Sequence, residues 1–304
     1  YDKNKTVARK QRGIYNKYRN QAILTDQRSV IMSRKDKEKK KKKTTGDYIL
    51  TFVLIVAICV FCYAAFNLYH IYTEYKKGTD EYNSISEMAV TERDPDDTED
   101  LGQPENQPTA PISIDFASLK SINDDVIGWI YMEALPQISY PVVQGEDNNT
   151  YLHQTYEKNY NFAGTIFIDY ENKRDFSDCN TLVYGHNMKN GSMFGMLKKY
   201  RADETLYNTS KYFWILTPEK NYRYEIIAAY TTSVNSETYT LFKGPGSEFL
   251  EYEKKMFQNS EIQTDASAED ADVKDKIVTL STCTGNQATR FVVQGKRVNA
   301  VDPQ

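Results

Sequence analysis

One cysteine, Cys283, ends the segment 279–283 (Thr-Leu-Ser-Thr-Cys), and Arg290 follows seven residues later. Upstream, His186 lies in the run Tyr-Gly-His-Asn at 184–187. A thiolate attacks carbonyl carbon, and a nearby imidazole or guanidinium favours its formation or stabilises the resulting oxyanion. The three side chains therefore predict an acyl-transfer site. The alternative is that an isolated cysteine is an ordinary small core residue, and residue type alone leaves that reading open.

The local pattern predicts how the cysteine and the arginine meet. Residues 277–283 alternate as a strand, which places Ser281 and Cys283 on the face opposite the apolar side chains. Turn residues follow at 284–289, and a returning strand begins at Arg290. Because antiparallel strands lie about 4.7–4.9 Å apart, we expect the arginine beside the cysteine across one ladder.

The elements around these residues are mainly β. Eight short strand-like runs with turn signals between them predict a barrel or a sandwich. Asp115, Ser192 and Ser247 are each predicted to cap a short helix, the last two over 193–200 and 248–258. The expected strands are 127–132, 138–144, 164–170, 180–187, 212–218, 222–232, 277–283 and 290–298.

The motifs resemble those of class B sortases. The resemblance rests on 184–187, on 279–283 and on Arg290 with the strand that follows it. It spans most of residues 113–299 and implies a closed eight-stranded barrel with short peripheral helices. Further matching blocks occur in the family's order at 125–130, 140–144, 163–170 and 191–195.

The resemblance implies a cysteine transpeptidase. Cys283 would attack a Thr carbonyl in the C-terminal sorting signal of a secreted protein, and class B enzymes favour signals similar to Asn-Pro-x-Thr. His186 would act as acid and base, and Arg290 would stabilise the oxyanion. An amine of a peptidoglycan precursor or a pilin would resolve the acyl-enzyme. Ser281 and Tyr184 are expected to contact substrate, although Ser281 also fits a hydroxyl bonded locally in its strand.

Two other readings stay open at this stage. A cysteine protease would use the same groups and let water resolve the acyl-enzyme, although in papain-like proteases the cysteine precedes the histidine. A non-enzymatic surface adhesin would need a C-terminal apolar tail, and the residues up to Gln304 show none. No cofactor or metal is expected, because the chain has neither a Gly-rich phosphate loop nor clustered His and Cys ligands.

An apolar segment near the N-terminus predicts a membrane anchor. Residues 48–73 contain no Asp, Glu, Lys or Arg, and a helix of roughly 17–25 apolar residues crosses a bilayer. The basic cluster at 34–43 comes before this segment, and the positive-inside rule then places the N-terminus in the cytoplasm. The cluster is also expected to attract anionic lipid. A nucleic-acid role is not expected, because the rest of the chain is acidic.

Charge divides the chain into four parts. Residues 1–47 form a basic cytoplasmic tail with 16 Lys/Arg and 5 Asp/Glu, and 48–73 form the anchor. Residues 74–112, acidic and containing proline, are predicted to be a linker, and 113–304 to be the extracellular catalytic domain.

The closely spaced Cys59 and Cys62 lie inside the apolar segment. Only Cys179 and Cys283 lie in the external domain, so no disulfide framework is expected.

Overall fold

The computed structural model describes residues 44–93, 108–242 and 244–303, together with Arg19, Gln21 and Thr25. The basic cluster at 34–43 and the central part of the predicted linker, 94–107, lie outside the described residues. The chain forms two compact units, Tyr1–Asn67 and Leu68–Gln304. The predicted site belongs to the second unit.

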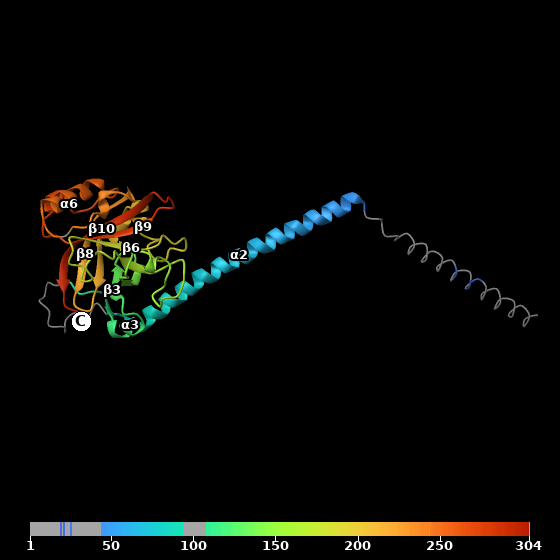
Figure 1. Cartoon of the computed structure of the whole chain (residues 1–304), viewed down its shortest axis with the longest axis horizontal. Helices are drawn as coiled ribbons and strands as arrows, with labels where there is room; N and C mark the ends of the chain where they lie inside the picture. Colours follow the sequence, from blue (N-terminus) through green and yellow to red (C-terminus); the bar gives the residue numbers. More distant parts are fainter. Residues whose placement is uncertain are drawn as a thin grey trace, which may run out of the picture. The chain divides into compact units, whose positions relative to one another are not determined.

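The second unit is built around a closed barrel of eight strands (Figure 1). Their order around the barrel is β10-β8-β7-β3-β4-β5-β6-β9. The β4–β5 and β6–β9 ladders are parallel, and the other ladders are antiparallel. The strands are β3 (Val126–Met132), β4 (Ser139–Val143), β5 (Ile166–Ile168), β6 (Asn180–Tyr184), β7 (Tyr212–Leu216), β8 (Asn221–Ser233), β9 (Ile277–Cys283) and β10 (Thr289–Val301).

Each strand coincides with a run predicted from the sequence, so the predicted fold class is confirmed. Most strand residues are buried, because the barrel interior takes one face of each strand while loops and helices cover much of the other. The four strands from β4 to β7 are shorter than expected. β5 begins only at Ile166, since Gly164 has a φ of 58° that a strand does not allow, and β6 ends at Tyr184.

Short helices lie around the barrel, and two match the prediction closely. In α3 (Phe116–Ile122) the Asp115 carboxylate accepts the Ser118 N–H at 3.0 Å, as an N-cap does. α6 (Ser247–Asn259) buries Phe249, Tyr252 and Met256 against the outside of the barrel. It begins at Ser247 itself, so that serine is not its cap.

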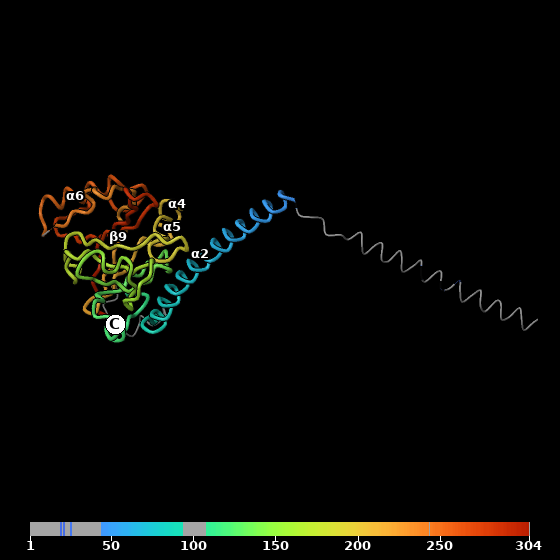
Figure 2. Tube along the Cα trace, turned by 45° about the vertical axis from the view of Figure 1, so that its right-hand side comes forward, coloured from blue at the N-terminus to red at the C-terminus, as the bar shows by residue number. Residues whose placement is uncertain are grey.

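The helix predicted after Ser192 is wrong. Met193 has a φ of 53°, outside the right-handed helical region, and its N–H donates to the Tyr140 hydroxyl at 3.1 Å. Turns therefore occupy the segment up to residue 198. The helices come later and lie side by side, as α4 (Lys199–Ala202) and α5 (Thr205–Thr209) (Figure 2).

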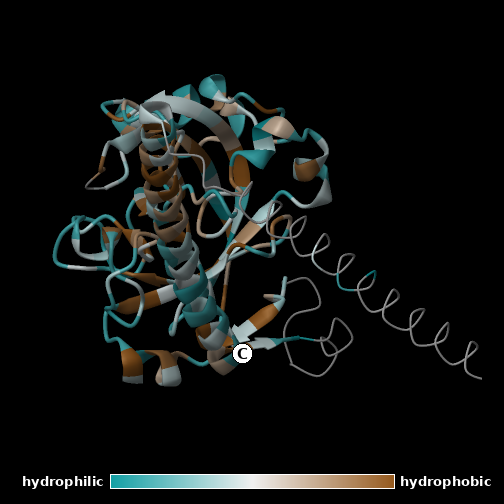
Figure 3. Cartoon of the chain, turned by 90° about the vertical axis from the view of Figure 1, so that its right-hand side faces the viewer, coloured by the Kyte–Doolittle hydropathy of each residue, from teal (hydrophilic) through white to brown (hydrophobic). Residues whose placement is uncertain are grey.

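The helix that begins near the predicted anchor is longer than expected. α2 runs from Thr45 to Ala89, and an 18-residue window within it is apolar enough to cross a membrane, with none of that window buried. Figure 3 shows the hydrophobic colouring of its first turns giving way to hydrophilic colouring further along. One long apolar helix is consistent with the expected membrane anchor.

The predicted linker also differs from the structure at both ends. Residues 74–89 are the last turns of α2, with Gly78, Tyr82, Ile85 and Ala89 buried against the barrel unit. β1 (Val90–Glu92) then pairs antiparallel with β2 (Ile112–Ile114). Residues 74–89 form a helix because their buried residues recur at helical spacing on one face. The prediction of a linker gave more weight to the acids and prolines that follow than to this spacing.

Candidate active site

A pocket at one end of the barrel brings together all five predicted site residues. Its volume is about 210 Å³. The lining includes Cys283 and Ser281 from β9, Arg290 from β10, Tyr184 from β6 and His186 just beyond it. Residues up to 142 positions apart in the sequence converge here, with Asn148, Leu152, Phe167, Gly185 and Thr282 completing the lining.

The strand ladders explain this convergence. The antiparallel β9–β10 ladder pairs Cys283 directly with Arg290, which confirms the predicted register. The parallel β6–β9 ladder pairs Tyr184 with Ser281, and the Gly185 N–H donates to the Ser281 carbonyl at 3.1 Å. His186 and Cys283 each lie two residues beyond that last pair. The ladder therefore sets the acid–base candidate beside the thiol.

Two side chains fix the position of Gly185. A Cβ built there would lie 2.4 Å from Ile166 Cδ1 and 2.7 Å from the Phe194 ring. Only glycine allows this approach. The backbone just before His186 is thus packed directly against two buried side chains.

The His186 ring is anchored by a backbone carbonyl. Its Nε2 lies 2.8 Å from the Leu152 oxygen, and since a carbonyl only accepts, Nε2 carries the proton. The His153 ring stacks on it with centroids 5.6 Å apart and 18° between the planes. In the neutral ring, Nδ1 is then the nitrogen that can accept a proton.

Burial lowers the pKa of His186 below its ordinary value of 6.5. The Leu152 carbonyl opposes this shift, and the charge of a protonated His153 adds to it. The ring is therefore neutral near pH 7, and it is able to take a proton from a thiol or an amine.

Arg290 keeps part of its guanidinium available. Its Nη1 donates to the carbonyls of Gln287 and Thr289, both at 2.9 Å. These bonds use both hydrogens of Nη1 and hold the side chain against its own loop. Within the part of the chain that the structure describes, Nε and Nη2 have no partner, so three N–H groups remain for an oxyanion or a substrate carbonyl.

The hydroxyls of the two predicted substrate-binding residues have partners within the protein. Ser281 Oγ is hydrogen-bonded to Tyr239 Oη at 2.9 Å, the local bonding that the sequence left open. Tyr184 Oη donates to Asp169 at 3.0 Å, and burial, with the nearby carboxylate, raises the pKa of this tyrosine. Both residues line the pocket. A ligand in the pocket would therefore meet side chains whose hydroxyls are already bonded within the protein.

Sequence reasoning missed several supporting residues. The Leu152 carbonyl has no sequence signal, because any residue type supplies one. Tyr239 lies in a short polar connection, and Asp169 follows β5; neither belongs to a motif with a mechanism. His153 is one of three histidines in the chain, and only the fold shows that it stacks on the catalytic candidate.

Comparisons with known proteins agree with this arrangement. A model of the sortase domain matches residues 130–298. Sortase B of Listeria monocytogenes is 37% identical over 189 residues, which cover 60% of this chain and 74% of the relative. The chain belongs to the class B sortases.

Solved sortase B structures have the same fold. Sortase B of Bacillus anthracis in complex with AAEK1 has a TM-score of 0.61 and 30% identity, over 75% of this chain and 99% of that one. The Staphylococcus aureus sortase B–substrate complex has a TM-score of 0.54 and 30% identity, over 60% and 84% of the two chains. This sortase is accordingly a cysteine transpeptidase.

The neutral state of His186 can be tested directly. A pH titration of the labelled imidazole in the folded sortase should give a midpoint below 6.5, because burial disfavours the imidazolium. The His186 pKa is lower in the folded state than in the unfolded chain. Folding stability should therefore fall as the pH drops below the unfolded-state pKa of this histidine. The urea-unfolded chain supplies the reference midpoint, and a folded-state midpoint at or above that reference would contradict the analysis.

Proposed function

We propose that this sortase cleaves a C-terminal sorting signal at a Thr carbonyl through Cys283 and passes the acyl group to an amine. The observation that carries the proposal is that Cys283, His186 and Arg290 line the same pocket. The family membership supports a sorting signal as the substrate. The S. aureus relative has been solved as a substrate complex.

The proposed first half-reaction forms a thioester. His186 takes the thiol proton at Nδ1, and the Cys283 sulfur bonds to the Thr carbonyl carbon. The C–N bond to the next residue breaks as the imidazolium gives its proton to the leaving amine. Arg290 stabilises the oxygen that becomes negative in between, through the N–H groups left free by its loop.

The second half-reaction transfers the acyl group. An amine of a peptidoglycan precursor or a pilin lysine attacks the thioester, loses a proton to His186, and the thiolate leaves. Hydrolysis by water is the alternative outcome at the same site. Adding a glycine peptide to the acyl-enzyme decides between them, because transpeptidation yields an amide and hydrolysis yields a free acid.

We further propose that α2 anchors the sortase with its N-terminus in the cytoplasm and the barrel outside. The charge difference supports this orientation, since residues 1–47 carry a formal +11 and the remainder −15. The apolar window of α2 lies between the two parts. The basic tail would also contact anionic lipid.

The orientation predicts a protease result. Protease added to intact cells without their wall should digest the part beyond residue 89 and spare the basic tail. Permeabilised cells are the control, in which both parts become accessible. Digestion of the tail with survival of the barrel in intact cells would reverse the proposed topology.

The nucleophile can be tested with two matched variants. Cys283→Ala in the full-length sortase should abolish thioester trapping and cleavage of a peptide pool based on Asn-Pro-x-Thr. Cys179→Ala should stay near wild type, since that thiol is fully buried under α6 and lies outside the pocket. Turnover by the Cys283 variant would refute the mechanism.

Arg290 and His186 should differ in their effects. His186→Ala should slow acylation and deacylation alike, by about 10²–10⁴-fold for lost general acid–base catalysis. Arg290→Ala should cost about 10²–10³-fold, as the loss of an oxyanion donor does. Arg290→Lys should rescue only weakly, because one ammonium cannot hold two loop carbonyls and present a planar fork.

Single-turnover rates for each half-reaction separate these roles. Gln287→Ala serves as a control on the same loop, since this exposed side chain does not line the pocket and the substitution keeps the backbone carbonyl that holds Arg290. Full activity in Arg290→Ala would show that the arginine is only a strand residue.

A further inference from the structure

The ring of His186 depends on a loop that has little regular structure of its own. Residues 150–165, here called the supporting loop, contain only the short helix η2 (Thr150–Leu152) and one isolated bridge, Gln154 to Tyr160. This loop supplies both the carbonyl bonded to His186 Nε2 and the ring stacked on it. One isolated bridge is not enough to hold the Leu152 carbonyl and the His153 ring in place, so other contacts must position the supporting loop.

The end of α2 packs on this loop. The Tyr82 hydroxyl donates to the Gly164 carbonyl at 2.6 Å and lies 3.1 Å from Thr165 Oγ1, with the tyrosine only 7% exposed. Asn161 Nδ2 donates to the Glu74 carbonyl at 3.1 Å. These contacts join elements more than 80 residues apart and tie the loop to the helix.

Further contacts come from the same face of α2. The Tyr75 and Phe162 rings meet edge to face with centroids 4.8 Å apart. The Glu157 N–H donates to Glu81 at 3.1 Å. The helix residues in contact are 74, 75, 78, 81 and 82. They lie three or four residues apart from one turn to the next, so they share one continuous face of the helix.

Gly164 links Tyr82 to the carbonyl that holds the histidine. It has a φ of 58°, and a Cβ built there would lie 2.6 Å from the oxygens of both Tyr151 and Leu152. The backbone of Gly164 therefore lies directly against the Leu152 carbonyl. A shift of Gly164 would displace that oxygen, because close-packed groups have no room to slide past each other.

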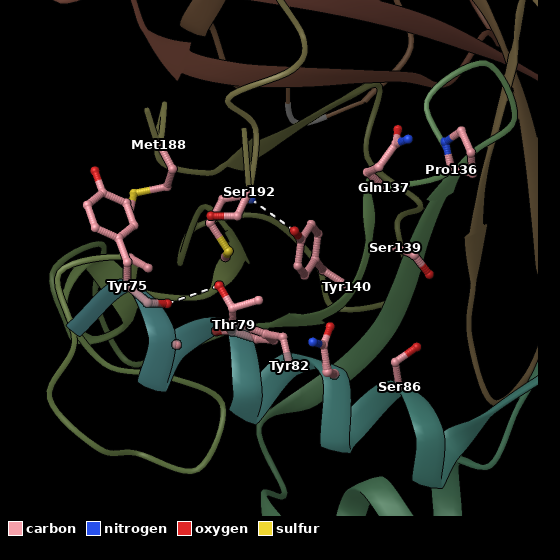
Figure 4. A pocket seen from close by; sticks show the side chains of 14 residues that line it. Tyr75, Thr79, Tyr82, Ser86, Pro136, Gln137, Ser139, Tyr140, Met188 and Ser192 are labelled. Atoms are coloured by element: carbon pink, nitrogen blue, oxygen red, sulfur yellow. Dashed lines mark hydrogen bonds between the residues drawn. The ribbon is translucent and has the colours of Figure 1, made fainter. Parts of the chain in front are cut away.

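The segment after His186 also lies close to α2. Met188 and Ser192 of that segment line a cavity together with Tyr75 and Tyr82 of the helix (Figure 4), and its volume is about 210 Å³. In that segment the Phe194 N–H donates to the His186 carbonyl at 3.0 Å. Both segments that hold His186 thus adjoin one helix face.

We infer that the end of α2 is a positioning element for His186, with Tyr82 as a positioning residue that acts through Gly164 and the Leu152 carbonyl. Tyr82 touches neither substrate nor the reacting atoms. The same continuous helix carries the candidate membrane span. The anchor and the support of the acid–base residue are then parts of a single element.

The test uses the full-length sortase in nanodiscs and two readouts. Tyr82→Phe keeps the ring and removes only the hydroxyl, so a buried carbonyl loses its donor. Because small misplacements of a catalytic group are costly, single-turnover acylation of the Asn-Pro-x-Thr peptide pool should fall about 10-fold. KM should stay within about twofold, since none of the helix residues lines the active-site pocket.

The second readout is the tautomer of His186, followed by ¹⁵N NMR of the imidazole. Wild type should show the proton fixed on Nε2, and Tyr82→Phe should show a mixture of tautomers. The inference rests on the proposed role of His186. The tautomer signal reports how the ring is held and does not depend on catalysis, so a failure of the inference can be told apart from a failure of the proposed function. An unchanged tautomer signal in Tyr82→Phe overturns the inference whatever happens to the rate.

A matched control and a second variant sharpen the result. Tyr72→Phe makes the same change on the same helix at a side chain that is 61% exposed, and both readouts should match wild type. Gly78→Leu favours the helix but crowds the Asn161 side chain, because a Cβ there would lie 3.3 Å from the Asn161 amide nitrogen. It should reproduce the Tyr82→Phe changes. Wild-type readouts in Gly78→Leu, or equal losses in Tyr72→Phe, would also overturn the inference.

Discussion

The site depends above all on the register of the parallel β6–β9 ladder. Tyr184 is paired with Ser281, so the residues two positions further on, His186 and Cys283, leave the ladder together and on the same side. A slip of one residue would turn one of the two side chains to the opposite face. The closed barrel prevents such a slip, because β6 is also paired with β5, and β9 with β10. The position of the proposed catalytic pair, separated by 97 residues, is therefore a property of the whole barrel.

The proposed reaction site lies where the ladders end. β6 stops at Tyr184, and β9 stops at Cys283 before a loop that returns at Thr289. Near these ends, backbone carbonyls hold the side chains of the pocket. The Leu152 carbonyl, in η2, holds the imidazole, and the carbonyls of Gln287 in the loop and of Thr289 at the start of β10 hold the guanidinium. The two thiols of the barrel unit differ in environment. Burial raises the pKa of Cys179, which lies just before β6 and packs against α6, whereas Cys283 is partly exposed in the pocket.

The sequence predicted the strands and the principal residues because both have local signals. Alternating side chains and turn residues located all eight strands, and the motifs around His186 and Cys283 singled out those residues and Arg290. Prediction failed where a tertiary contact decided the local structure. Met193 takes a positive φ while its N–H bonds to Tyr140, a residue 53 positions away, so the helix expected there does not form. The partners of Ser281 and Tyr184 were likewise hidden, since Tyr239 and Asp169 reach the pocket only through the fold.

The end of α2 shows a different kind of failure, because its pattern was present in the sequence. Gly78, Tyr82, Ile85 and Ala89 recur at spacings of three and four, as a helix that buries one face requires. The acids and prolines after residue 90 led to the prediction of a linker over the whole segment 74–112. The composition of a segment indicates whether it would fold in isolation. The spacing of its apolar residues indicates whether it can form a helix that packs against another part of the protein. A glycine on the buried face is informative here, since Gly78 lets the helix approach Asn161 where any side chain would crowd it. The order of this segment is thus set by the barrel surface that it covers.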